Sequence, residues 1–206
     1  NYPIMKKLLQ GVKTEEWLVF LAVGAVVYTI VSNRSKGGTR GALAKVDKSK
    51  NYVIGDSQSP YIDWGSEKVS VIGKKGNVGS EEFLWTGGKD LKWLKGALAK
   101  YLVSPDVNSI TINIGTNGGF NQNEDVAGLV ELVKQKFPNA QLLAVQGSWG
   151  WGGNAKITES QVRAYYKKFK DAGVELVEPP IGAIEPHGNK PVYKTIGANL
   201  DKAIRS

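Results

Sequence analysis

The chain has 206 residues, of which 41% are hydrophobic and 22% charged, which fits one globular domain and excludes disorder as the main state. It has no cysteine and one histidine, which excludes disulfide scaffolds, thiol catalysis and Cys- or His-rich metal sites. The net charge of +8 is uneven, because residues 1–50 carry nine Lys or Arg against three Asp or Glu, whereas the remainder is nearly neutral. A basic segment of this kind is typical of a linker or of contact with anionic lipid, and no nucleic-acid partner is expected.

The first long stretch without charge is 17–32, with the sequence WLVFLAVGAVVYTIVS. At about 1.5 Å per residue it would span roughly 24 Å, somewhat less than a hydrocarbon core of about 30 Å. This pattern predicts a single transmembrane helix over 17–32 after an N-terminal flank over 1–16, with membrane lipid as its partner. A signal-peptide core and a buried helix are the alternatives. We therefore expect a single-pass membrane protein, with a virion membrane as one setting and the side of the membrane left open.

Residues 33–50 are rich in Gly, Ser and Lys, which is typical of a flexible basic linker and places a domain boundary near Asn51. From there to residue 206, short apolar runs alternate with helical patterns. Strands are predicted at 52–55, 69–73, 109–115, 140–147 and 173–180. Helices are predicted near 81–102, 124–137, 158–172 and 192–204. This alternation predicts an α/β fold with a five-stranded parallel sheet, helices on both faces, and a site beyond the carboxyl ends of the strands.

Polar residues follow four of the predicted strands. GDSQS at 55–59 follows the first strand, GNVGS at 76–80 the second, GTNGG at 115–119 the third, and His187 comes after the fifth. A serine nucleophile needs a base, and His187 is the one histidine that could serve. Glycine amides and an asparagine side chain can supply the hydrogen bonds that an oxyanion requires. These residue types can therefore supply a nucleophile, a base and donors to an oxyanion.

The four blocks resemble those of the SGNH hydrolases, also called the GDSL esterase/lipase family, over roughly 51–206. GDSQS is similar to the nucleophile block with Ser57, and Gly79 is matched to the second block. GTN is similar to the third block with Asn117, and His187 precedes a predicted C-terminal helix as in the fifth. The resemblance implies a flavodoxin-like three-layer sandwich that hydrolyses esters without a metal or organic cofactor.

The same resemblance implies a role for each matched residue. Ser57 would be the nucleophile and His187 the general base. The oxyanion would be held by the amides of Ser57 and Gly79 and by the side chain of Asn117. The third block of the family usually reads Gly-x-Asn-Asp, and here Gly118 stands in the place of the aspartate.

The acid that orients the histidine is a second departure from the family pattern. The fifth block usually reads Asp-x-x-His, and Ile184 stands at the aspartate position. Glu185 precedes Pro186, which favours an extended backbone and places the side chains of Glu185 and His187 on the same side. We therefore predict Glu185 as the third catalytic residue, ahead of a backbone carbonyl and of Glu178.

Trp149 and Trp151 follow the fourth predicted strand in the sequence GSWGWGG. They could stack on sugar rings at the rim of the site, or pack on the sheet as core. The leading hypothesis is a membrane-anchored serine esterase that removes acyl groups, such as acetyl, from a carbohydrate or lipid. The alternative is a catalytically weak or inactive structural or binding protein that joins other proteins in a membrane-associated assembly such as a virion. The two departures favour the alternative, and the four matched blocks favour the enzyme.

Overall fold

Five parallel strands form the centre of the fold in the computed structural model, which describes residues 48, 50–72 and 84–205. They are β1 (Asn51–Gly55), β2 (Ser70–Val71), β3 (Ser109–Asn113), β4 (Gln141–Val145) and β5 (Glu175–Val177). Their order is β2-β1-β3-β4-β5, and every neighbouring pair is parallel. The predicted five-stranded parallel sheet is therefore confirmed. This is the strand order of flavodoxin-like sheets, in which the winding reverses between β1 and β3.

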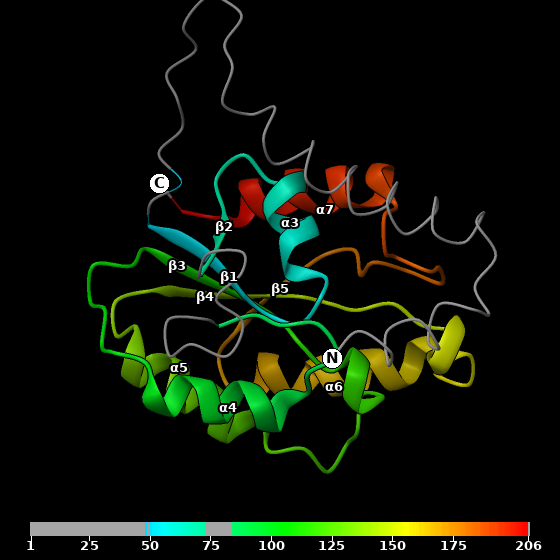
Figure 1. The fold of residues 1–206 in the computed structure, drawn as a ribbon, viewed down its shortest axis with the longest axis horizontal. Helices are drawn as coiled ribbons and strands as arrows, with labels where there is room; N and C mark the ends of the chain where they lie inside the picture. Colours follow the sequence, from blue (N-terminus) through cyan, green and yellow to red (C-terminus); the bar gives the residue numbers. More distant parts are fainter. Residues whose placement is uncertain (1–47, 49, 73–83, 206) are drawn as a thin grey trace, which may run out of the picture. The chain divides into compact units, whose positions relative to one another are not determined.

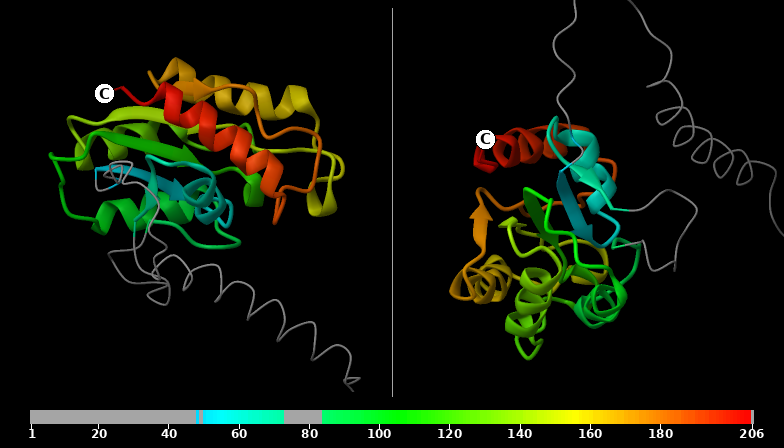
Figure 2. Two further views of the ribbon diagram at one scale, coloured as in Figure 1. Left: turned by 90° about the horizontal axis from the view of Figure 1, so that it is seen from above. Right: turned by 90° about the vertical axis from the view of Figure 1, so that its left-hand side faces the viewer.

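Helices cover both faces of this sheet (Figures 1 and 2). One face carries α3 (Ser59–Gly65) and α7 (Lys190–Ala203), and the other carries α4 (Leu91–Lys100), α5 (Val126–Lys136) and α6 (Glu159–Asp171). Successive strand residues point to opposite faces, so Val53 packs in the cluster under α3 and α7, and Ile54 in the cluster under the other three helices. The result is a three-layer arrangement with one apolar core on each face of the sheet.

The segment before α4 differs from the prediction of a helix over 81–102. Within its described part, residues 84–86 run beside β1 and exchange backbone hydrogen bonds with Gly55. The helix begins at Leu91, after the Asp90 carboxylate accepts a hydrogen bond of 2.9 Å from the amide of Trp93. Backbone groups that bond to a strand cannot also form the hydrogen bonds of a helix. The helix therefore starts at Leu91 and not near residue 81, where the apolar pattern predicts it.

No helix in the described part of the chain is long and apolar enough to cross a membrane. The longest, α7, has 14 residues, which at about 1.5 Å per residue gives roughly 21 Å, against a hydrocarbon core of about 30 Å. The predicted localisation as a single-pass membrane protein is therefore contradicted by this structure. The segment 17–32, on which that prediction rested, lies outside the described residues, as do the flank 1–16 and all but two residues of the linker.

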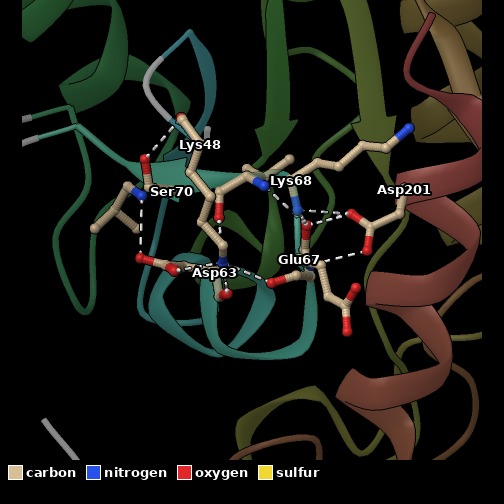
Figure 3. A network of polar contacts seen from close by, with 9 residues as sticks. Lys48, Asp63, Glu67, Lys68, Ser70 and Asp201 are labelled. Carbon is tan, nitrogen blue, oxygen red and sulfur yellow. Dashed lines mark hydrogen bonds and ion pairs between the residues drawn. The ribbon is translucent and has the colours of Figure 1, made fainter. Parts of the chain in front are cut away.

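Lys48 binds the end of α3, although it falls within the predicted linker (Figure 3). Its Nζ donates to the carbonyl oxygens of Asp63 at 3.1 Å, Ser66 at 2.6 Å and Val69 at 3.1 Å. It also lies 3.5 Å from the Asp63 carboxylate. The last carbonyls of a helix lack intrahelical donors and carry partial negative charge, so a cation is favourable there. Lys48 is therefore part of the folded unit rather than of a free tether.

The loop after α3 is also bonded to α7, through Asp201 (Figure 3). The Ser66 hydroxyl donates to one oxygen of the Asp201 carboxylate. The amides of Glu67, at 2.8 Å, and Lys68, at 3.2 Å, donate to the same carboxylate. These bonds connect the two helices that cover one face of the sheet.

We predict that Lys48→Met lowers the free energy of unfolding by about 2 kcal/mol, because three carbonyls lose a charged donor. Urea unfolding of the full chain, followed by circular dichroism, measures the change. Lys50→Met is the matched control, since Lys50 is exposed, and it should change stability by less than about 0.5 kcal/mol. Equal stability of the two variants would contradict the role given to Lys48.

Candidate active site

Ser57 follows β1 at a turn that requires glycine at position 55. Gly55 has a φ of +141°, and a Cβ there would lie 1.8 Å from the carbonyl oxygen of Asn113 on β3. The amide of Asp56 donates to that same carbonyl at 3.1 Å. Only glycine permits both this φ and this close approach. Ser57 is thereby held at the carboxyl end of β1, where the strand order reverses and α/β sheets place their ligands.

Buried polar side chains fix the backbone on both sides of Ser57. Oδ1 of Asp56 accepts a hydrogen bond of 3.0 Å from the amide of Gln58. Nε2 of Gln58 donates to Oγ1 of Thr116 at 3.0 Å, and its Oε1 accepts from the hydroxyl of Tyr193 at 3.3 Å. Because Asp56 and Gln58 are fully buried, these bonds are shielded from water, which strengthens them.

His187 lies against Ser57, although 130 residues separate the two. Oγ of Ser57 is 2.9 Å from Nε2 of His187, and Nδ1 of His187 is 2.6 Å from Oε1 of Glu185. An ionised carboxylate can only accept, so the proton of the neutral ring lies on Nδ1 and Nε2 accepts from the Ser57 hydroxyl. The backbone amide of His187 also donates to Oε1 of Glu185, at 3.0 Å. The structure therefore brings Ser57, His187 and Glu185 into one line of contacts.

Glu178 and Ile184 lie away from the imidazole. Oε1 of Glu178 accepts from Nε2 of Gln146 at 2.8 Å and lies 3.6 Å from a guanidinium nitrogen of Arg163. The Ile184 side chain packs against the apolar cluster under α3 and α7. The carboxylate on Nδ1 thus comes from Glu185, the residue next to the position where the resembled family has its aspartate.

Gly87, which the sequence analysis did not single out, lies beside Ser57. The backbone bonds of Gly55 bring the segment 84–86 alongside β1, and a Cβ on Gly87 would lie 3.6 Å from Cβ of Ser57. Gly79, the glycine expected here, lies outside the described residues. The signal that could have found Gly87 is the sequence WTGGKD, in which a pair of glycines is followed by Lys89 and then by the helix cap Asp90.

Asn117 lies at the same edge of the sheet, in the short 3-10 helix η2 (Thr116–Gly118) that follows β3. The residue is exposed, and its Nδ2 donates to the carbonyl oxygen of Lys89 at 3.0 Å. Lys89 is two residues after Gly87. The loop after β3 and the segment after Gly87 are therefore bonded to each other.

The two tryptophans of the GSWGWGG segment lie in different surroundings. The ring of Trp151 is edge-on to that of His187, with 5.5 Å between centroids, and its Nε1 donates to Oγ of Ser148 at 2.7 Å. Trp149 packs against the core under α4, α5 and α6, and its amide donates to the carbonyl of Gly182 at 3.2 Å. The structure thus brings Trp151 to the base and leaves Trp149 with the core.

Tyr61 is a second aromatic residue beside the base that the sequence analysis missed. Its ring lies edge-on to His187 at 6.2 Å between centroids and is stacked on Tyr193 at 5.1 Å. The available signal was its position four residues after Ser57, on the helix that follows the nucleophile. Among the described residues, no three His, Asp or Glu side chains converge as a metal-ion site.

Comparison with solved structures identifies the fold. The chain is similar to a protein from Bacteroides fragilis described as an acylhydrolase, with a TM-score of 0.53 and 15% sequence identity over 79% of this chain and 90% of that one. It is also similar to a lipase/acylhydrolase from Enterococcus faecalis, with a TM-score of 0.50 and 15% identity over 74% and 93% of the two chains. Neither a protein-family model nor a curated protein sequence matches the chain. The likeness is therefore one of fold.

Asp56 is a buried acid directly before Ser57 in the chain. Burial raises the pKa of Asp56 to about 7, and the hydrogen bond from the amide of Gln58 is the largest effect that opposes this rise. Its second oxygen, Oδ2, is buried and has no hydrogen-bond partner within the described residues. An acid whose pKa rises on folding binds its proton more tightly in the folded state. The ionisation of Asp56 therefore lowers the free energy of unfolding as the pH rises from about 4, the ordinary pKa of an aspartate, to about 7.

We predict that Asp56→Asn flattens the dependence of stability on pH between 5 and 8. The amide keeps an oxygen that can accept from Gln58 but cannot ionise, so the wild type should lose more stability over this interval than the variant does. Urea unfolding of both proteins at pH 5 and pH 8 gives the comparison. Parallel pH profiles for the two proteins would show that Asp56 does not titrate in this range.

Proposed function

We propose that this chain is a serine ester hydrolase. In it Ser57 attacks the carbonyl carbon of an ester, His187 accepts and returns the proton, and Glu185 orients His187. The line of contacts from Glu185 through His187 to Ser57, at 2.6 and 2.9 Å, is the observation that carries the proposal. The solved acylhydrolases support it by analogy of fold.

The reaction follows from the positions of the protons. As Oγ of Ser57 bonds to the carbonyl carbon, its proton passes to Nε2 of His187, and the resulting imidazolium is stabilised by the Glu185 carboxylate. Collapse of the tetrahedral intermediate breaks the bond to the alcohol oxygen, which takes the proton from Nε2. Water then attacks the acyl-enzyme by the same steps, releasing the acid and regenerating Ser57.

The negative oxygen of the intermediate requires donors in fixed positions. We assign this role to the amides of Ser57 and Gly87 and to the side chain of Asn117. Gly87 takes the place given to Gly79 at the level of sequence, because its backbone is next to Ser57. The Asn117 amide would exchange its bond to the Lys89 carbonyl for one to the oxyanion as substrate binds.

For the substrate we propose an acylated carbohydrate, with a small acyl group such as acetyl. The leaving oxygen must lie near Nε2 of His187 to take its proton, so the alcohol part of the ester lies beside that ring. Trp151 and Tyr61 flank the same ring. Aromatic faces suit the apolar faces of sugar rings, which favours a carbohydrate over a lipid alcohol at this position.

We predict that the full chain hydrolyses p-nitrophenyl acetate and that Ser57→Ala abolishes this activity with little change in melting temperature. A fluorophosphonate probe should modify the wild type at Ser57, located by peptide mapping, and should leave the variant unmodified. As the control for folding, the circular dichroism spectrum of Ser57→Ala should match that of the wild type. A wild type that neither hydrolyses the ester nor reacts with the probe would favour the binding-protein alternative.

A matched pair of variants tests the acid. Glu185→Gln should lower kcat far more than tenfold, because neutralising the acid of a serine protease triad costs about 10⁴. Glu178→Gln removes a carboxylate from the same region that bonds to Gln146 instead, and it should lower kcat by less than about threefold. Steady-state kinetics on p-nitrophenyl acetate gives both values. A loss below about threefold in Glu185→Gln, with Ser57→Ala inactive, would leave a dyad of Ser57 and His187.

A further inference from the structure

The carboxylate of Glu124 lies against Gly118, the residue that follows Asn117. A Cβ built on Gly118 would lie 2.7 Å from Oε1 of Glu124 and 3.6 Å from its Oε2. Real Cβ atoms do not approach other atoms as closely as 2.7 Å, so the carboxylate fills the space in which a side chain at 118 would begin. Gly118 does not have a left-handed φ, so backbone conformation does not require glycine here, and a side chain at 118 would have to displace the end of the Glu124 side chain.

Contacts from α6 hold Glu124 in this position. The hydroxyl of Tyr165 donates to Oε2 of Glu124 at 2.6 Å. Nζ of Lys168, one turn further along the same face of the helix, donates to the carbonyl oxygens of Gln122 at 2.8 Å and Glu124 at 2.6 Å. Tyr165 is buried and packs edge-on against Phe120 at 5.6 Å between centroids. Both the backbone and the side chain of Glu124 are thus anchored on one rigid element.

The same helix also binds the far end of the Asn117 loop. Nε2 of Gln161 donates to the carbonyl of Gly119 at 3.0 Å, and the amide of Gly119 closes η2 by donating to the carbonyl of Thr116 at 3.1 Å. The loop is therefore held after Asn117 by Gln161 and covered at Gly118 by Glu124. A shift of this loop would move the Asn117 side chain with it.

We propose that Glu124 is a positioning residue for Asn117, and that its carboxylate replaces the side chain that Gly118 lacks in setting the place of the η2 loop. The inference rests on the proposed esterase function, in which Asn117 stabilises the oxyanion. At position 118 the resembled family usually has an aspartate. In this chain the carboxylate beside that position belongs to Glu124, six residues further along the chain, and not to the η2 loop itself.

A double-mutant cycle on kcat tests the proposal. Glu124→Ala should lower kcat by up to about 10²-fold, the loss expected when a catalytic group is displaced by about 1 Å, with KM for p-nitrophenyl acetate changed less than about threefold. Asn117→Ala should cost about 10²–10³. The double variant should lose no more than Asn117→Ala alone, because Glu124 then has no donor left to position. Independent losses that multiply would overturn the proposal.

Glu131→Ala is the matched control for the single variant. Glu131 is an exposed glutamate on α5 that pairs with Lys134 at 2.9 Å, and its removal should leave kcat unchanged. A similar loss of kcat in Glu131→Ala would show that removal of any surface carboxylate has this effect. That result would also overturn the proposal.

Returning the carboxylate to the loop should rescue activity. Gly118→Asp alone overfills the space and should lower both kcat and the melting temperature, whereas Gly118→Asp combined with Glu124→Ala should regain at least about tenfold in kcat over Glu124→Ala. If Glu124 had only a structural role, the double variant would recover its melting temperature but not its kcat. That result, in a protein whose hydrolysis still depends on Ser57, would refute the inference. Absence of Ser57-dependent hydrolysis in the wild type would instead refute the proposed function, and with it the catalytic part of this inference.

Discussion

The position of Ser57 relative to His187 depends on a contact between the backbones of α3 and α7. A Cβ on Gly197 would lie 2.2 Å from the carbonyl group of Gly65, so the two helices touch where neither has a side chain. Helix α3 begins two residues after Ser57, and α7 begins three residues after His187. The packing of these helices therefore sets how Oγ and Nε2 meet. The bonds of Lys48 and Asp201 at the end of α3 stabilise the same pair of helices.

Much of the fold could be predicted from the sequence because its signals are local. Apolar runs of strand length alternate with amphipathic segments, and this pattern identified all five strands of the sheet. The position of Glu185 beside His187 is also a local property, since Pro186 extends the backbone between them. The contact of His187 with Ser57 was expected only because the blocks resemble those of a known family. Neither periodicity nor composition could have linked two residues 130 positions apart.

What the sequence did not show depends on contacts between distant segments. The glycines of 76–80 and 87–88 look alike in the chain, and only the pairing of 84–86 with β1 identifies Gly87 as the neighbour of Ser57. Trp149 and Trp151 have nearly the same local sequence, yet one packs with the core and one contacts His187. Lys48 belongs to a segment with the composition of a linker, yet it donates to three carbonyls of α3 and of the loop after it. In each case the outcome depends on tertiary hydrogen bonds and packing, which local propensity does not encode.

Glu185 and His187 share one short loop, so the two residues form a preassembled unit. The bond between them is closed by the loop's own backbone, through the amide of His187, and does not depend on how the helices pack. The contact with Ser57, in contrast, joins the segments that precede α3 and α7. Loosening the packing of α7 against α3 would therefore separate Oγ of Ser57 from Nε2 of His187, while the bond between His187 and Glu185 stays closed.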